Sequence, residues 1–184
     1  MKSNLKLFKK LKNMLIPNFI IPDLRTDHAG ETGAVFIYKG ILMISKDKEI
    51  IEFANNHMLT EKKHLELIEQ ILPENERSKL LFLWRFLGFL TGLIPAIFGK
   101  KIIYVTIFFV ESFVEKHYDA QVLKLRKTNK YKELVQFLEK LKNEEISHKE
   151  DSLNRFGELN TLLKIWGNII EIGSKTAVLI SHKI

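Results

Sequence analysis

The sequence predicts an all-α protein, organised as a four-helix bundle with two additional apolar helices. Glycine and proline are scarce, at 9 and 4 of 184 residues. Apolar residues recur with the 3.6-residue period of a helix rather than the two-residue period of a strand. A chain of this length is most simply one domain with a substantial core. We therefore expect a basic amphipathic lead-in over residues 1–22 and one helical domain over residues 23–184.

The composition limits the chemistry that the chain can perform. There are no cysteines, which excludes disulfides, iron–sulfur clusters, thiolate zinc sites and a cysteine nucleophile. Any metal must therefore be held by oxygen and imidazole. A net charge of +7 suggests an anionic partner. The sequence contains no nucleic-acid-binding motif, so we do not expect nucleic acid to be that partner. An acidic membrane surface is the other anionic partner that the charge suggests. The coding bias of an AT-rich genome explains the abundant Lys and Ile equally well.

The lead-in carries five lysines and no acid within residues 1–17, interleaved with leucines and a phenylalanine. A basic amphipathic segment of this kind can lie on a membrane surface, so residues 1–15 are a candidate contact. A frayed, solubilising terminus is the alternative. The segment lacks the continuous apolar stretch of a secretory signal.

The first two helices have recognisable boundaries. Pro22 ends the lead-in, and we expect Asp23 or Asp27 to cap a helix that continues to about residue 45. Asp47 is then placed to cap a second helix, which ends before Pro73.

The third segment, residues 80–98, is apolar except for Arg85. Its 19 residues barely meet the length needed to cross a bilayer, and a buried bundle helix can be equally apolar. We favour an interfacial membrane contact over a buried helix or a true span. Gly88 and Gly92 form a GxxxG spacing that permits close helix approach, which is weak evidence for a homodimer.

Three further helices complete the prediction. A fourth spans about residues 101–127, and a fifth spans about residues 130–156 and stops at Gly157. The last, at residues 161–180, is apolar and is expected to pack across the bundle or against whatever the third helix contacts.

The chemistry is concentrated in two Glu-x-x-His motifs, Glu61–His64 and Glu145–His148. In both helices, the acid and the histidine occupy positions of the apolar stripe where a core-facing helix normally carries leucines. Burying a lone carboxylate costs several kcal/mol, so four inward groups require a cationic partner. A pair of metal ions meets that requirement.

The motifs belong to an internal repeat. Glu31 precedes Glu61 by 30 residues, Glu111 precedes Glu145 by 34, and each lone acid lies on the inward face of its helix. One Glu from each of two helices and Glu-x-x-His from each of two others form the di-iron or di-manganese set of carboxylate bundles. Roughly half of one such motif is expected by chance, but two in register with lone acids are not.

Several neighbours of these residues are candidates for supporting roles. His57 lies two turns before His64 and is expected to be a core or supporting histidine. His28 either hydrogen-bonds Glu31 or starts its helix, while His117 and Tyr118 can support the metals, face a substrate or simply pack. Glu144 points about 100° away from Glu145 along the helix, so we expect it to be solvated.

The sequence resembles the demethoxyubiquinone hydroxylase family of ubiquinone biosynthesis from residue 24 to the C-terminus. Four stretches carry the resemblance: LRTDHAGETGA at 24–34, EKKH at 61–64, VESFVEKHY at 110–118 and NEEISH at 143–148. The Asp-His-Ala-Gly-Glu run is the most specific of them. The resemblance implies a ferritin-like fold and places the metal ligands on the six residues that periodicity selects, namely Glu31, Glu61, His64, Glu111, Glu145 and His148.

The resemblance also implies a function. A demethoxyubiquinone ring would be hydroxylated with O₂ at two iron ions, with NADH as electron source despite the absence of a GxGxxG fingerprint. Glu61 and Glu145 would bridge the metals. The polyprenyl substrate and a peripheral location suit residues 80–98, on the cytoplasmic face of a bacterial inner membrane or the matrix side of the mitochondrial one. A biosynthetic complex is a possible partner. Ser112 and Thr32 depart from the family's pattern beside the ligands.

Three alternatives use the same helices differently. A ferroxidase or iron-handling protein would share the ligands but not need an apolar segment at residues 80–98. A radical-generating or fatty-acyl oxidase would not predict the Asp-His-Ala-Gly-Glu run. A metal-free helical scaffold for a membrane-bound biosynthetic complex would bind no iron, so metal content separates it from the others.

Overall fold

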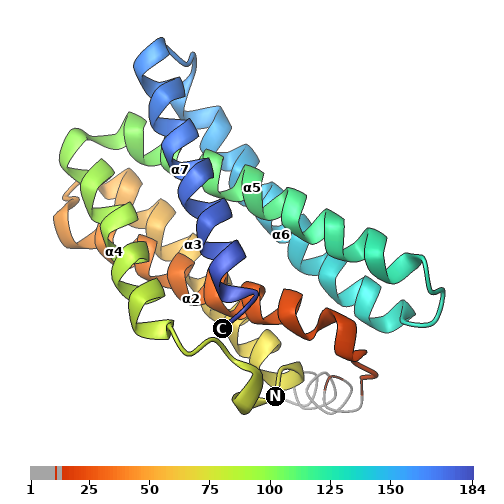
Figure 1. Cartoon of the computed structure of the whole chain (residues 1–184). Coiled ribbons are helices and arrows are strands. Elements are labelled where there is room, and N and C mark those ends of the chain that lie inside the picture. The colour runs from red at the N-terminus through yellow and green to blue at the C-terminus, as the bar shows by residue number, and fades with distance from the viewer. Residues whose placement is uncertain (1–10, 12–13) are drawn as a thin grey trace, which may run out of the picture.

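The computed structural model describes residue 11 and residues 14–184, and over these residues the protein is all-α, as predicted (Figure 1). Most of the candidate membrane contact at residues 1–15 lies outside the described part, which includes only residues 11, 14 and 15 of it. Two 3₁₀ turns, at Asn18–Ile20 and Glu74–Glu76, accompany the helices. The described helices are α2 (Ile21–Ile44), α3 (Lys48–Ile71), α4 (Leu81–Phe98), α5 (Lys100–Arg126), α6 (Lys132–Phe156) and α7 (Thr161–Ser181).

The helices form a bundle of four with two covering helices. α2 packs against α3, and α5 packs against α6. α4 lies along α2 and also contacts α5, while α7 crosses α5 and α2 (Figure 1). The predicted four-helix bundle is therefore α2, α3, α5 and α6, and the two additional apolar helices are α4 and α7.

The core is divided into two apolar clusters. The first includes Leu24 and Leu138, and the second includes Ile50 and Ile107. In all four bundle helices, residues of the two clusters lie on either side of the inward acids, because the Glu and His positions interrupt each apolar stripe. The polar residues are thus enclosed between two hydrophobic layers. From the lead-in, Leu11 is buried in the first cluster.

The helix boundaries follow the predicted signals with one exception. The Asp47 carboxylate accepts hydrogen bonds from the backbone N–H groups of Glu49 and Ile50, and Gly157, at φ 69°, follows the last residue of α6. The prediction that Asp23 or Asp27 caps the first helix is wrong. The chain enters α2 directly from the 3₁₀ turn, and Pro22 is accommodated in the first turn, where no intrahelical N–H is required. Asp27 lies a full turn inside α2.

Glycines bring α2 and α4 unusually close together. A Cβ on Gly88 would lie 2.3 Å from the carbonyl oxygen of Gly33, and one on Gly92 would lie 1.8 Å from that of Ile37. On the α2 side, a Cβ on Gly40 would lie 2.2 Å from the carbonyl oxygen of Phe89. The GxxxG spacing is therefore used within the chain and gives no support for the predicted homodimer.

Replacing Gly92 with Ala is expected to destabilise the protein strongly. The new methyl group meets backbone rather than a movable side chain, so α2 and α4 must separate, at a cost of about 3 kcal/mol or more. Thermal unfolding followed by circular dichroism measures the loss. Gly173→Ala is the matched control, because its Cβ would meet nothing within 4 Å. Alanine there should stabilise α7 by about 0.5–1 kcal/mol. Equal stability of Gly92→Ala and the wild type would contradict the close approach.

α4 and α7 present large apolar side chains to the outside. Among the described helices, α4 alone is long and apolar enough to cross a membrane by length and composition, and only 22% of that stretch is buried. The alternative of a wholly buried third helix is therefore wrong. We call the following exposed residues the α4–α7 surface: Phe82, Leu83, Phe86, Leu87, Ile94, Ile97 and Phe98 on α4, and Leu162, Ile165, Ile169, Ile172 and Leu179 on α7.

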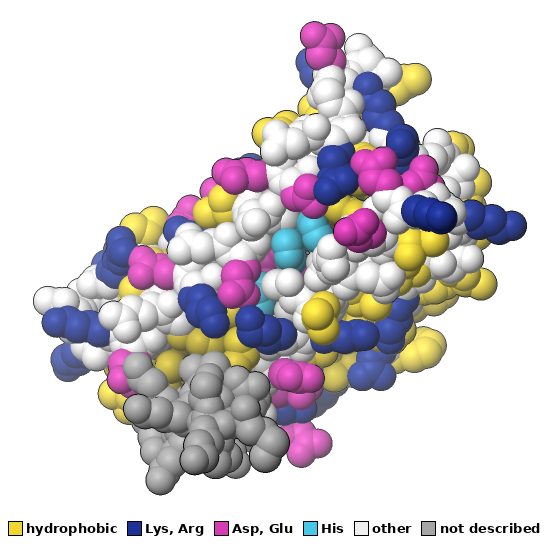
Figure 2. Space-filling view, turned by 180° about the vertical axis from the view of Figure 1, so that it is seen from behind, with side chains coloured by type: hydrophobic (Ala, Val, Ile, Leu, Met, Phe, Trp, Pro, Cys, Tyr) yellow, Lys and Arg dark blue, Asp and Glu magenta, His cyan; other side chains and the backbone are white. Residues whose placement is uncertain are grey.

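The opposite side of the molecule is different in character. Seen from behind, Lys, Arg, Asp and Glu side chains are spread across the face, and histidine side chains are visible between the helices near its centre (Figure 2). The protein is therefore polarised, with charge on one side and aliphatic and aromatic groups on α4 and α7.

Candidate metal centre

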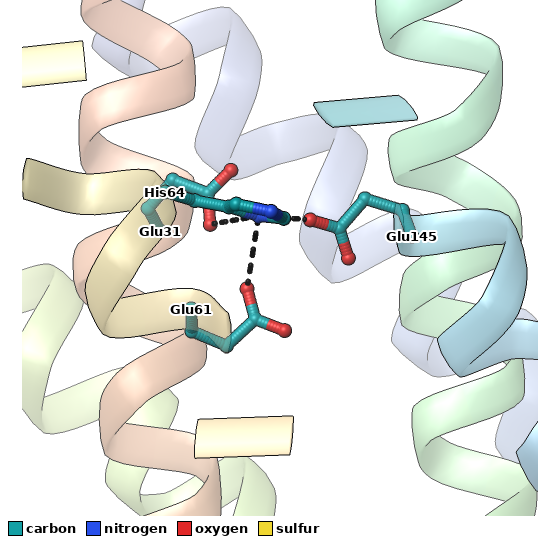
Figure 3. Close-up of side chains that lie close together, drawn as sticks. All are labelled: Glu31, Glu61, His64 and Glu145. Carbon is teal, nitrogen blue, oxygen red and sulfur yellow. Dashed lines mark ion pairs between the residues drawn. The ribbon is translucent and has the colours of Figure 1, made fainter. Parts of the chain in front are cut away.

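All six residues selected from the sequence converge between the four bundle helices. Glu31 comes from α2, Glu61 and His64 from α3, Glu111 from α5, and Glu145 and His148 from α6; all are buried. They form two groups whose potential ligand atoms lie within 4.8 Å of one another. One group is Glu31, Glu61, His64 and Glu145 (Figure 3), and the other is Glu61, Glu111, Glu145 and His148. Glu61 and Glu145 belong to both.

The two imidazoles point the same atom into the cluster. His64 Nδ1 lies 2.6 Å from Glu145 Oε1 and 3.8 Å from Glu31 Oε2. His148 Nδ1 lies 2.9 Å from Glu61 Oε1 and 3.3 Å from Glu145 Oε2. Despite these short distances, neither Nδ1 atom has a hydrogen-bonding geometry with any group of the described residues, nor do Glu61 Oε1 or the two Glu145 oxygens.

Buried polar atoms left without hydrogen bonds are costly, and their concentration here requires a partner of another kind. In their deprotonated forms, the four carboxylates and the two Nδ1 atoms offer only lone pairs to the space between them. Two divalent cations would neutralise the four negative charges, and hard oxygen donors with imidazole suit iron or manganese. The donor set therefore fits the predicted pair of metal ions.

Charge crowding shifts the pKa values of these groups strongly in the metal-free protein. Burial, reinforced by Glu145, raises the pKa of Glu61 and of Glu111 well above the usual range; Glu31 adds to the effect on Glu61, and Glu61 adds to that on Glu111. Burial also opposes ionisation of Glu145, yet the adjacent His148 and His64 rings lower its pKa to about 2. For His64, burial favours the neutral ring, but Glu144 and Glu145 together raise the pKa.

The metal-free protein is expected to lose stability as the pH rises above about 4.5. A carboxyl group whose pKa is raised by folding contributes stability below its unfolded pKa, which is lost as the pH rises toward the folded pKa. Glu61 and Glu111 both act in this direction, and so do His64 and His148, whose pKa values are raised. Melting temperatures of chelator-treated protein should therefore fall between pH 5 and pH 8. With Fe²⁺ bound the trend should reverse, because metal binding displaces protons. A melting temperature that rises with pH in the chelated protein would contradict this.

His117 and Tyr118 lie at the α2 side of the centre. The Tyr118 hydroxyl donates a hydrogen bond to Glu31 Oε1 at 2.8 Å. His117 Nε2 lies 3.2 Å from Asp27 Oδ1 and 2.7 Å from the Thr26 hydroxyl. Asp27 is buried and also accepts a hydrogen bond from Gln121, while its second oxygen has no partner among the described residues. The sequence analysis treated Asp27 as a helix cap and not as a residue of the site, although its position four residues before Glu31 places it on the same helix face.

His57 supports the other end of the centre, as the sequence suggested. Its ring stacks on that of His148 with centroids 4.1 Å apart. Nδ1 lies 3.2 Å from the Tyr38 hydroxyl, and Nε2 lies 3.0 Å from Asp151 Oδ2. Burial and the nearby His148 lower the pKa of His57 to about 4, so this ring is neutral at physiological pH. His57 is therefore a packing and hydrogen-bonding neighbour of the proposed ligand set.

Two neighbouring residues differ from expectation. Glu144 is only partly solvated: its side chain is 30% exposed, and its Oε2 lies 2.6 Å from His64 Nε2. The rotation away from Glu145 points it across the interface to α3 rather than outward. His28 neither hydrogen-bonds Glu31 nor starts its helix. It lies inside α2, where its Nε2 is 3.2 Å from Glu69 Oε1 on α3.

An apolar cavity of about 500 Å³ connects the centre to the α4–α7 surface. Glu31, Glu61, Glu111 and Glu145 line its inner end, with Asp27, His117 and Tyr118 beside them. The remaining walls are mostly apolar residues of α2, α4, α5 and α7. Leu87, Ile94 and Ile169 line the cavity and are also exposed, so it opens between α4 and α7. A volume of this size accommodates a small organic ring.

Comparison with known proteins agrees with this geometry. The family described as "Ubiquinone biosynthesis protein COQ7" matches residues 19–181, which is most of the chain. The chain belongs to the COQ7 family. The matched residues, 19–181, include all of α2 to α7 and all six residues of the cluster.

Similar proteins of known name occur in eukaryotes and bacteria. The chain is 31% identical to the mitochondrial "NADPH-dependent 3-demethoxyubiquinone 3-hydroxylase" of Dictyostelium discoideum, over 96% of this chain and 81% of the relative. The Homo sapiens protein of the same name is 29% identical, over 88% and 76%. The "3-demethoxyubiquinol 3-hydroxylase" of Rhodospirillum rubrum is 25% identical, over 88% and 76%.

The two positions that depart from the COQ7 pattern do not line the cavity. The Thr32 hydroxyl donates to the carbonyl of His28, and the Ser112 hydroxyl donates to that of Phe108. Both side chains are thus satisfied within their own helices, and neither belongs to the cavity lining. Neither departure therefore changes the wall of the cavity beside the cluster.

Proposed function

We propose that this chain is a 3-demethoxyubiquinone 3-hydroxylase, an O₂-dependent monooxygenase of ubiquinone biosynthesis. The observation that carries the proposal is the placement of the Glu/His cluster at the inner end of an apolar cavity, in a chain of the COQ7 family. A quinone ring entering this cavity would meet the carboxylate cluster first. We assign this activity to a di-iron domain over residues 23–184.

We assign the metal centre to two iron ions. Glu31, Glu61, His64 and Glu145 would hold one ion, and Glu61, Glu111, Glu145 and His148 the other, with Glu61 and Glu145 as bridges. Bound iron would supply the O₂ activation and electron transfer that no side chain of a cysteine-free chain can provide. Rigid helices set the spacing of the ligands before metal binds.

The chain's own groups would orient the ring and exclude water. The cavity walls are apolar, so the quinone displaces water from the space beside the carboxylates. Tyr118 holds Glu31 in place through its hydroxyl. Asp27 and His117 form the polar edge of the cavity nearest Glu31, where they can hydrogen-bond an oxygen substituent of the ring.

Reduced nicotinamide nucleotide is the proposed electron source. The sequence resemblance suggested NADH, whereas the names of the Dictyostelium and human relatives specify NADPH. Turnover of purified protein with each nucleotide in turn decides between them.

The membrane is the proposed source of substrate, and the protein a peripheral one. The cavity opens between α4 and α7, whose exposed side chains are apolar, so a polyprenyl tail can extend from the cavity into lipid. A true span by α4 is unfavourable, because α4 packs along α2 and would bring the charged residues of that helix into the bilayer. The location would be the cytoplasmic face of a bacterial inner membrane, or the matrix face of the mitochondrial one.

Quinone analysis of a complemented deletion strain tests the proposal. In a host that lacks its own hydroxylase, expression of this chain should convert accumulated demethoxyubiquinone to the hydroxylated product and restore ubiquinone, as measured by mass spectrometry. Glu150→Gln, on an exposed position of α6, should complement equally well. Persistence of the precursor with a well-expressed, iron-loaded chain would refute the proposal.

The ferroxidase alternative is less compatible with the structure. Iron oxidation needs a hydrophilic path for the ion, whereas the cavity that reaches this cluster is predominantly apolar. A metal-free scaffold gives no reason to bury four carboxylates together, and would bind no iron.

A further inference from the structure

The two Glu-x-x-His motifs have different surroundings, although the sequence repeat makes them look equivalent. His64 is fully buried, and its two ring nitrogens have separate partners. Nδ1 faces the cluster, 2.6 Å from Glu145 Oε1, while Nε2 lies 2.6 Å from Glu144 Oε2 on the outer side. Glu144 is therefore an acid that contacts a proposed ligand without belonging to the ligand set.

Glu144 fixes the tautomer of His64. A carboxylate accepts hydrogen bonds only, so Nε2 must carry the proton, and the lone pair of the neutral ring is then on Nδ1, directed into the cluster. A carboxylate in this position also makes the imidazole a better ligand. Lys63 and Lys140 each place an ammonium group 3.9 Å from Glu144 Oε1, the oxygen that does not contact His64.

His148 lacks a partner of this kind. Its Nδ1 faces Glu61 and Glu145, but among the described residues no side chain hydrogen-bonds its Nε2. The ring instead stacks on His57, which constrains its plane but not the position of its proton. In the repeat, the residue that precedes Glu61 is Thr60, where α6 has Glu144. The half of the centre that contains His148 therefore has no carboxylate at the corresponding position.

We infer that Glu144 is a positioning residue that makes the two halves of the centre unequal, so that the half containing His64 binds the first divalent cation and the half containing His148 binds the second. The inference rests on the metal centre of the proposed function and adds an order of filling to it. Loss of a carboxylate partner of a ligating histidine typically lowers metal affinity 10–100-fold. We therefore expect the metal affinities of the two halves to differ by about this factor.

Titration with Mn²⁺, followed by electron paramagnetic resonance, tests the order of filling without any measurement of turnover. Wild-type protein should give the signal of isolated bound Mn²⁺ up to about one equivalent, and the signal of an exchange-coupled pair only as the second ion binds. Glu144→Gln should still bind two ions. Its first step should weaken by about 10–100-fold, so that coupled pairs form from the start of the titration.

The control is Glu150→Gln, which removes the same charge from an exposed position on α6. It should leave both binding steps unchanged, and circular dichroism should show that both variants retain their helices. An equal effect of Glu150→Gln would reduce the result to general electrostatics and overturn the inference. An unchanged first step in Glu144→Gln, or coupled pairs from the outset in the wild type, would do the same while leaving the di-iron proposal intact. Failure of the wild type to bind Mn²⁺ or Fe²⁺ at all would refute both.

Discussion

Replacing Glu61 with Gln is expected to abolish binding of both metal ions and all hydroxylase turnover, while making the metal-free protein more stable. Glu61 belongs to both four-residue groups, so its carboxylate serves both proposed ions. Without metal, the same carboxylate lowers the stability of the fold. Its pKa is raised well above the usual range by burial and by Glu145, so folding must either bury a charge or take up a proton. The amide requires neither.

The size and sign of the stability change can both be measured. Near neutral pH the cost of proton uptake falls on the wild type and not on the variant, so chelator-treated Glu61→Gln should have the higher melting temperature. The gain should increase from pH 5 to pH 8. Iron content by mass spectrometry should fall from about two ions per chain to none or to trace amounts.

Glu150→Gln serves as the control for Glu61→Gln as well, because it should keep its iron and have the same melting temperature as the wild type. Retention of two ions by Glu61→Gln would remove Glu61 from the centre. A lower melting temperature of the metal-free variant would mean that the carboxylate is stabilised within the fold, and that the centre is an ion-pair network rather than a metal site.

The helical fold and the six converging residues could be predicted because both depend on periodicity along one helix. An acid that replaces an aliphatic residue on an apolar stripe must face the bundle interior, and Glu31, Glu61, Glu111 and Glu145 all do. The chain's local signals were equally informative at Asp47 and Gly157, whose roles depend only on adjacent backbone.

What could not be predicted depends on neighbouring helices. Periodicity placed Glu144 about 100° from Glu145, but whether that direction leads to water or to His64 depends on the position of α3. The same limit applies to Gly88 and Gly92, whose spacing shows that something approaches closely without showing that it is α2 of the same chain. Asp27 looked like a cap because local sequence cannot show that Gln121 and His117, 90 or more residues away, bind it.

The cavity joins these two kinds of information and explains the polarity of the molecule. Its inner end is made of residues that the sequence selected, and its mouth is formed where α4 and α7 cover the bundle. A purely protective cover would turn its apolar residues inward. Here Phe82 is 83% exposed and Ile165 is 53% exposed, so the covering helices are apolar on the outside as well. That arrangement favours a lipid surface at the cavity mouth.

The double replacement of Phe82 and Phe86 with Asp is therefore expected to reduce partitioning onto liposomes by at least about 100-fold. Each exposed ring contributes about 1.5–3 kcal/mol when it enters the apolar region of a membrane, and 1.4 kcal/mol corresponds to a factor of ten. Neither residue lines the cavity, so turnover of a short-tailed, water-soluble quinone should be retained while turnover of a long-tailed quinone in liposomes is lost. Co-sedimentation with vesicles of phosphatidylcholine and phosphatidylglycerol measures the partitioning.

Leu59→Asp is the matched control, because Leu59 is 70% exposed on α3, outside the α4–α7 surface, and its replacement should leave binding unchanged. If the double variant still co-sediments like the wild type, the substrate must reach the cavity by a route other than direct contact between α4 and the membrane.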